Sequence, residues 1–149
     1  MSTLTATFVL GLAVLATAAA FGQDKGKGDV EKLTGIWTCV SGANDGKPLS
    51  DETVKELKLT LTADRYKTEL GKQVLFDSTY KVDATKNPGH IDIIGTEGEN
   101  KGKAAQGIYA FEGDTLKLCY TMPGKARPTS FESKLDSGAT LTVWKRSKS

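Results

Sequence analysis

Hydrophobic and polar residues alternate one by one over several stretches of this chain, which is the pattern of β-strands with one buried face. Leu57, Leu59 and Leu61 alternate with polar residues in this way, and the longest alternation spans residues 74–83. Single helical turns are predicted at residues 29–33 and 51–55. The predicted strands are residues 35–41, 57–62, 65–70, 74–83, 90–94, 107–111, 115–121, 129–133 and 140–146.

Most connections between these predicted strands are short. Short connections cannot make the crossovers that parallel strands need, so the sheet is expected to be antiparallel. A sheet of this size with one apolar face closes into a barrel or folds into a sandwich. The 149-residue chain has the length of one domain. We therefore expect an all-β domain at residues 33–147, an antiparallel up-and-down β-barrel of eight or nine strands.

The first 22 residues differ from the rest of the chain. No charged side chain precedes Asp24, and an apolar run extends from Phe8 to Phe21 and includes three consecutive alanines near its end. This run is shorter than the roughly 20 apolar residues of a membrane-spanning helix, and small residues at its end suit signal peptidase. We expect a signal peptide at 1–22 and a flexible lead-in at 23–32.

Cleavage of this segment would release the protein to the periplasm or the extracellular space, without stable insertion in a membrane. The region before the apolar run has no Lys or Arg, whereas signal peptides usually begin with a positive charge. An uncleaved membrane anchor therefore stays open as the alternative.

The two cysteines, Cys39 and Cys119, are compatible with an exported chain. They could form one intramolecular disulfide or remain two thiols. The alternation places Cys39 on the inward face with Trp37 and Cys119 on an outward face, which argues mildly against a disulfide. Two cysteines and one histidine supply few ligands for a metal site, so we expect neither a metal nor another cofactor.

The charged residues do not point to a nucleic-acid partner or to an active site. The net charge is +2, with 20 basic and 18 acidic residues mixed along the chain, whereas nucleic-acid binders usually show a clustered basic face. No serine lies in the strand–turn–helix elbow of a hydrolase. An enzyme is not expected; a hydrolase would require His90, Arg127 and a carboxylate to meet in one cleft.

Aromatic residues on the predicted strands are the main indication of function. If they face inward, they line a cavity with apolar walls and a few phenolic hydroxyls, which suits a small, mostly apolar ligand. The candidate cavity residues are Tyr66, Phe76, Tyr80, Tyr109, Phe111, Tyr120 and Phe131.

Two alternatives to this ligand cavity stay open. The barrel could be filled by its own side chains and bind another exported protein, as an interaction or inhibitor module, through loops at residues 42–50 and 95–103. Arg127, which precedes Pro128, is expected either to contact an acidic group or to donate structural hydrogen bonds to loop carbonyls.

One motif resembles a known family. Gly35-Ile36-Trp37, on the first strand after a short helical segment, is similar to the Gly-x-Trp motif of lipocalins. Together with segments at 45–49, 107–109, 113–120 and 123–131, it makes nearly the whole mature chain resemble an uncharacterised family of exported lipocalin-like domains from planctomycete bacteria. The resemblance implies a calycin-type barrel whose closed end is plugged by Trp37, with Arg146 packed over it as a cation–π pair. It implies no activity.

Overall fold

The computed structural model describes residues 28–147, so the predicted signal peptide and the first part of the lead-in lie outside the described residues. Residues 28–33 form a short helix, which contains the helical turn predicted at 29–33. Residues 28–32 of the predicted flexible lead-in are therefore helical. No helix in the described part of the chain is long and apolar enough to cross a membrane.

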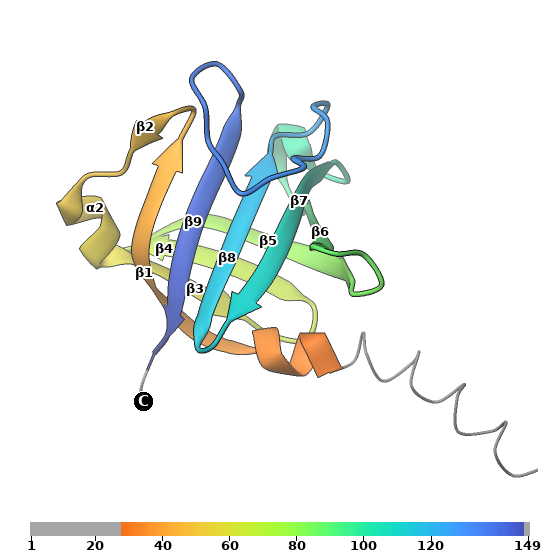
Figure 1. Ribbon diagram of the computed structural model, residues 1–149, viewed down its shortest axis with the longest axis horizontal. Helices are drawn as coiled ribbons and strands as arrows, with labels where there is room; N and C mark the ends of the chain where they lie inside the picture. Colours follow the sequence, from red (N-terminus) through yellow and green to blue (C-terminus); the bar gives the residue numbers. More distant parts are fainter. Residues whose placement is uncertain (1–27, 148–149) are drawn as a thin grey trace, which may run out of the picture.

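Within residues 28–147, antiparallel strands form one sheet that closes on itself (Figure 1). The strand order is β2-β1-β3-β4-β5-β6-β7-β8-β9, and an additional pairing of β1 with β9 closes the ring. The short β2 lies outside this ring, which leaves an eight-stranded barrel and confirms the predicted all-β antiparallel fold. The strands are β1 (Gly35–Asn44), β2 (Lys47–Pro48), β3 (Leu57–Leu61), β4 (Arg65–Leu70), β5 (Gln73–Asp83), β6 (Gly89–Ile94), β7 (Ala104–Glu112), β8 (Thr115–Thr121) and β9 (Ala139–Arg146).

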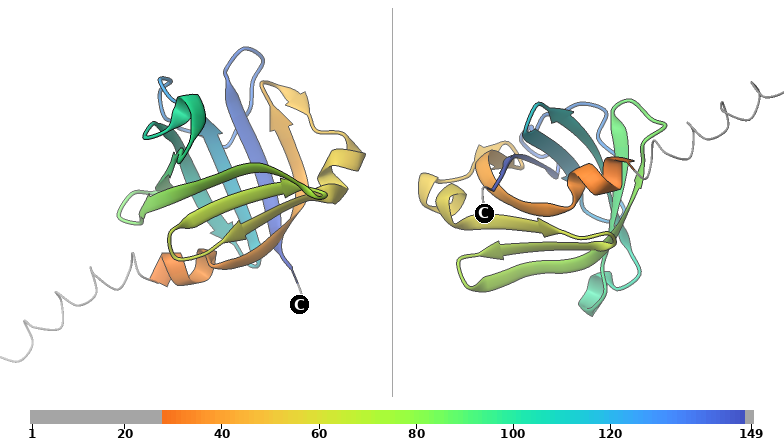
Figure 2. Two further views of the ribbon diagram at one scale, coloured as in Figure 1. Left: turned by 180° about the vertical axis from the view of Figure 1, so that it is seen from behind. Right: turned by 90° about the horizontal axis from the view of Figure 1, so that it is seen from below.

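Two short helical segments lie in the connections. Helix α2 (Asp51–Glu56) connects β2 to β3, and the Ser50 side chain accepts a hydrogen bond from the Thr53 backbone N–H as its N-cap. The 3₁₀ helix η1 (Gly98–Asn100) lies between β6 and β7. The left view of Figure 2, seen from behind, shows β3, β4 and β5 crossing in front of β7, β8, β9 and β1 at a steep angle, so the strongly sheared sheet encloses a central core.

The strand predicted at residues 129–133 is wrong. These residues belong to the long connection between β8 and β9. Both edges of β8 are already paired, one with β7 and the other with β9. Both edges of β9 are paired as well, with β8 and with β1. No edge is left for another strand there. The connection instead packs Phe131 onto the outer face of the barrel, against the cluster of Ile108, Cys119 and Ala139.

Inward side chains of every long strand build the main core. Leu59, Trp37, Leu116, Leu118 and Trp144 are almost completely buried. The alternation read from the sequence holds for β3, where Leu57, Leu59 and Leu61 face the core and the two residues between them are half-buried. This core is packed most densely in the half of the barrel next to the helix at residues 28–33, which is called the helix side below. The opposite end of the barrel holds a cavity.

Candidate ligand-binding site

A cavity of about 270 Å³ opens at the end of the barrel away from the helix at residues 28–33. Its walls come from β1, β3, β4, β5, β8 and β9, together with α2 and the segment before it. Most of its surface is apolar. The apolar wall is formed by Leu49, Leu57, Leu75, Phe76, Met122 and Trp144.

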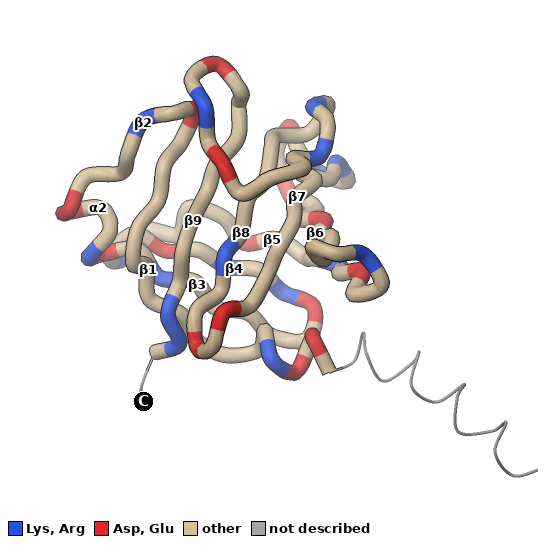
Figure 3. The backbone as a smooth tube through the Cα atoms, in the orientation of Figure 1, with Lys and Arg blue, Asp and Glu red and all other residues tan. Residues whose placement is uncertain are grey.

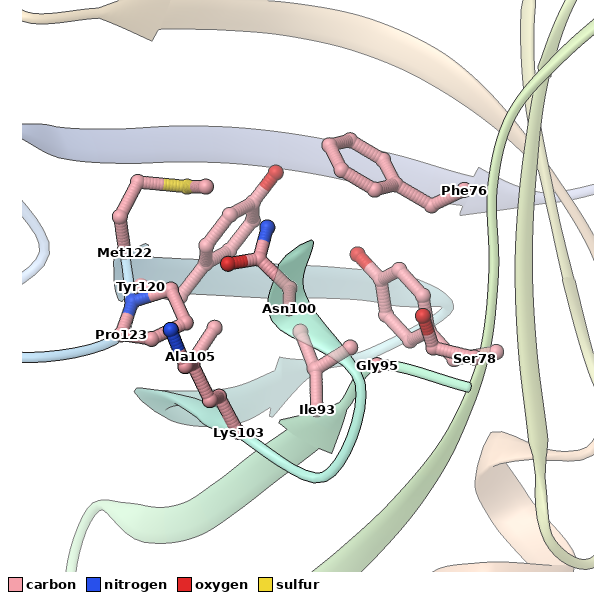
Figure 4. Close-up of a pocket in the computed structure, with 11 residues that line it drawn as sticks. Phe76, Ser78, Ile93, Gly95, Asn100, Lys103, Ala105, Tyr120, Met122 and Pro123 are labelled. Carbon is pink, nitrogen blue, oxygen red and sulfur yellow. The ribbon is translucent and has the colours of Figure 1, made fainter. Parts of the chain in front are cut away.

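A smaller chamber of about 50 Å³ adjoins this cavity and shares Tyr66, Phe76, Tyr120 and Met122 with it. It extends between β5 and β6 on one side and the loop that contains η1 on the other. Figure 4 shows Phe76 and Tyr120 pointing toward one another across this space, with the Asn100 amide beside the Tyr120 ring. Because they share these four lining residues, the two chambers are together called the recess.

Hydroxyl groups are the main polar groups on the wall of the larger cavity. They belong to Thr53, Tyr66, Thr68, Tyr120, Thr140 and Thr142. Burial raises the pKa of the Tyr66 phenol well above its usual value, with the neighbouring Tyr120 as a smaller cause. Burial also raises the pKa of the Tyr120 phenol, against the opposing effect of a hydrogen bond with Thr140. Both phenols therefore stay neutral at physiological pH.

No charged side chain is among the described residues that line the larger cavity, and Lys103 is the charged residue that lines the smaller chamber. Elsewhere on the backbone, positive and negative residues are interspersed without a face of one sign in the view of Figure 3. The larger cavity is thus an uncharged compartment in a protein whose surface charge is mixed.

Three of the seven predicted cavity residues line the recess: Tyr66, Phe76 and Tyr120. Tyr66 is buried, whereas Phe76 stands at the mouth with 41% of its surface exposed. Phe131 does not face the interior at all, because it packs on the outer face in the β8–β9 connection.

The other three predicted cavity residues, Tyr80, Tyr109 and Phe111, pack in or against the helix-side core. The Tyr80 hydroxyl donates to the Thr62 carbonyl at 2.7 Å. The Tyr109 hydroxyl donates to Asp29 Oδ2 at 2.6 Å, and its ring meets Phe111 edge-to-face at a centroid distance of 6.0 Å. These aromatic side chains fill their half of the barrel, so the interior is part packed core and part cavity.

The sequence analysis missed several lining residues, including Trp144 and Thr142 on β9 and Thr68 on β4. A signal for the first two was present. Alternation along β9 places Thr140, Thr142 and Trp144 on the same face as Arg146, which was expected to point inward.

Trp37 and Arg146, the residues expected to close the barrel, lie together at the helix side. The guanidinium carbon of Arg146 is 4.3 Å from the centroid of the Trp37 ring. Arg146 also donates to the carbonyls of Thr34, at 3.0 Å, and Lys32. The Trp37 indole N–H donates to the Leu33 carbonyl at 2.8 Å. The first strand, the last strand and the N-terminal helix are thereby joined at one point.

Cys39 and Cys119 are both free thiols. Cys39 is opposite Trp144 on β9 and packs against the main core, whereas Cys119 lies in the outer-face cluster with Phe131. Burial raises the pKa of each thiol. The two side chains lie on opposite faces of the barrel wall, so this structure holds no disulfide between them.

Arg127 donates hydrogen bonds to the carbonyls of Ile91 and Gly107 at 3.1 and 2.8 Å, and to Asp92 Oδ1 at 2.7 Å. Arg127 thereby attaches the β8–β9 connection to β6 and β7. Its carbonyl partners lie in strands, whereas the sequence analysis expected loop carbonyls. His90 and Arg127 do line a common groove on the outer surface. Asp92 Oδ1 accepts from the guanidinium, and Asp92 is not among the described residues that line this groove.

In the part of the chain that the structure describes, no group of three or more His, Cys, Asp or Glu side chains is placed to hold a metal ion. No known family model matches this chain, and no curated protein or solved structure shows significant similarity to it. The function therefore has to be argued from the recess itself.

Proposed function

We propose that this protein is an exported, lipocalin-like binding protein that holds one small, mostly apolar molecule in the recess at the open end of its barrel. The observation that carries the proposal is the cavity of about 270 Å³, which is open at one end and has an apolar, uncharged wall. Ligand sites in proteins are typically concave and mostly apolar, with a few placed polar groups.

The size of the cavity limits the ligand. A dry cavity of roughly 150 Å³ in another protein holds benzene, and pockets for drug-sized molecules start at roughly 300 Å³. A cavity of about 270 Å³ therefore fits a molecule between these two, such as a bicyclic hydrocarbon. For a ligand of this size, with the usual cost of lost translational freedom, we expect a Kd of about 10 to 100 µM.

Isothermal titration calorimetry with tetralin, a bicyclic hydrocarbon, tests the proposal. Thr140 lines the cavity from β9, so Thr140→Phe should fill part of it and weaken tetralin binding about tenfold or more. Thr115 lies on the outer face of β8 opposite Lys145, so Thr115→Phe is a matched control that should leave the affinity unchanged.

Native mass spectrometry of the protein purified from its own host complements this titration by detecting a co-purifying ligand. Failure of tetralin to bind, together with the absence of any co-purifying small molecule, would contradict the proposed function. Equal tetralin affinities in the two phenylalanine variants would also contradict it, because binding would then lie elsewhere on the protein.

An interaction module is the second candidate, and the exposed side chains at the mouth favour it. Val74, Leu75, Phe76 and Met122 are each between 41% and 48% exposed. If they form a protein-binding surface, a photo-crosslinker at position 75 should capture one defined exported protein, and Thr140→Phe should not reduce the yield. A ligand-binding protein predicts no such defined product.

A further inference from the structure

Two hydroxyls in the recess make no hydrogen bond to a described residue, and one of them, Thr68 Oγ1, is fully buried. Tyr66 is 2% exposed and Thr68 is 6% exposed, and both line the larger cavity from the inward face of β4. Thr68 Oγ1 has no hydrogen-bond partner among the described residues. No hydrogen bond contributes to the raised pKa of Tyr66 either, which is set by burial and by Tyr120.

Several other buried hydroxyls of this barrel have protein partners. The hydroxyls of Tyr80 and Tyr109 donate to Thr62 and Asp29, and the Thr142 hydroxyl accepts from the Trp144 indole N–H at 2.8 Å. Leaving a buried polar group without a partner is unfavourable. Tyr66 and Thr68 are therefore available for a partner from outside the chain.

The backbone next to these two residues is irregular. The register of β4 against β5 shifts between Thr68 and Glu69, where Leu75 of β5 is the extra residue, and such bulges are common next to functional sites. Residues two apart on one strand face have Cα atoms about 7 Å apart. Tyr66 and Thr68 therefore point to the same side of the sheet, and Thr68 Oγ1 reaches a ligand once its side chain takes a rotamer that turns it into the cavity.

We infer that the ligand is a neutral ketone, alcohol or amide, whose polar group bonds to Tyr66 and Thr68 while its apolar body packs against Leu57, Phe76 and Trp144. This inference rests on the proposed function and adds the chemical class of the ligand. A charged head group is disfavoured, because the described residues lining the larger cavity include no charged side chain to offset its lost hydration.

The test compares three probes with similar apolar bodies: tetralin, 2-tetralone and tetralin-2-carboxylate. Calorimetry on the wild-type protein should show 2-tetralone binding about tenfold more tightly than tetralin, because tetralin leaves the two hydroxyls unpaired. The carboxylate should bind least tightly. The infrared carbonyl band of bound 2-tetralone should move to lower frequency, as expected for a carbonyl that accepts a hydrogen bond.

Tyr66→Phe should reduce the preference for 2-tetralone over tetralin to about twofold or less, and should reverse the infrared shift. The preference is the ratio of the 2-tetralone and tetralin affinities measured on the same variant, so a general change in the shape of the cavity affects both probes alike. Thr68→Val is the second variant and should reduce the preference in part. Tyr80→Phe is the matched control, because its hydroxyl already bonds to Thr62, and it should keep the full preference.

The inference on ligand class is overturned if tetralin and 2-tetralone bind equally well to the wild type, if the carboxylate binds most tightly, or if the ketone preference survives in both Tyr66→Phe and Thr68→Val. Each of these results leaves binding in the cavity standing. Failure of all three probes to bind, with nothing co-purifying, overturns the proposed function together with the inference.

Discussion

Replacing Arg146 by alanine tests whether the helix side of the barrel is held closed by this one side chain. The guanidinium lies over the Trp37 ring and donates to the carbonyls of Thr34 and Lys32. The variant removes all three contacts, while the hydrogen bond from the Trp37 indole to Leu33 remains. We expect the N-terminal helix to lose its attachment to β9 and to open more easily than the rest of the barrel.

The expected loss of stability is about 2 kcal/mol. A cation–π pair at an exposed site contributes about 0.5 to 1 kcal/mol. Hydrogen bonds to charged groups contribute roughly 1.5 to 3 kcal/mol when well protected, and the exposure of Arg146 reduces this to about 0.5 to 1 kcal/mol for each of the two carbonyl bonds. Arg146→Lys keeps the charge but not the planar fork, so it should lose about half as much.

Urea denaturation followed by tryptophan fluorescence measures this loss. With an m value of about 1 to 2 kcal/mol/M, Arg146→Ala should lower the midpoint by about 1 to 2 M at unchanged slope. Lys145→Ala is the matched control, because Lys145 is exposed and adjacent on β9, and surface substitutions of this kind stay within about 0.5 kcal/mol. A loss below about 0.5 kcal/mol in Arg146→Ala, or an equal loss in Lys145→Ala, would refute the reasoning.

Three further predictions follow from contacts elsewhere in the barrel. Gly35→Ala should cost about 2 to 3 kcal/mol in urea denaturation, because φ is +142° there and the added Cβ would lie 2.7 Å from Arg146 Nη1; a neutral variant would contradict this. All four tyrosines have a pKa raised by burial, so the folded protein should show little phenolate absorbance at 295 nm near pH 10. Since the unfolded chain ionises at about pH 10, stability should fall as the pH rises above that value, and two or more tyrosines titrating near pH 10 in the folded state would contradict this. Unreduced, unfolded protein should add two alkyl groups from iodoacetamide by intact mass, because both cysteines are free; addition of none before reduction would show a disulfide.

The architecture was largely predictable because alternation and connection length are local properties that here agree with the fold. Eight of the nine predicted strands occur as strands of the barrel. The resemblance to lipocalins implied that Arg146 packs over Trp37, and closure of the ring pairs these two residues directly between β1 and β9.

The failed strand prediction at residues 129–133 has a non-local cause. The stretch around Phe131 has the composition of a strand, but a strand needs a free edge, and closure of the barrel leaves none at β8 and β9. Phe131 is apolar because it covers Cys119 and Ile108 from outside. Only the completed ring shows that the outer face of a barrel also has an apolar patch that must be covered.

The candidate cavity was predictable only in part. Inward alternation correctly marked Tyr66 and Tyr109 alike, yet the first lines the recess and the second is buried beneath the N-terminal helix through its bond to Asp29. The shear of the barrel decides which inward residues reach which end, and shear depends on the register of all eight strand pairs. Alternation along β9 marks Trp144 as inward-facing, but its depth in the barrel follows from the register and is not visible in its own strand.

The two ends of the barrel differ in how completely their polar groups are paired, and this difference supports the placement of the ligand. At the helix side, the indole of Trp37, the phenols of Tyr80 and Tyr109, and the guanidinium of Arg146 all have protein partners. At the open end, Thr68 Oγ1 has none among the described residues. An unpaired buried hydroxyl costs about 1 to 3 kcal/mol, which is comparable to the contribution expected from Arg146. The paired polar groups at the helix side stabilise the barrel enough for it to tolerate an unpaired hydroxyl at the open end. Removal of the Thr68 hydroxyl should then leave the stability of the protein unchanged or increase it, while ligand binding weakens.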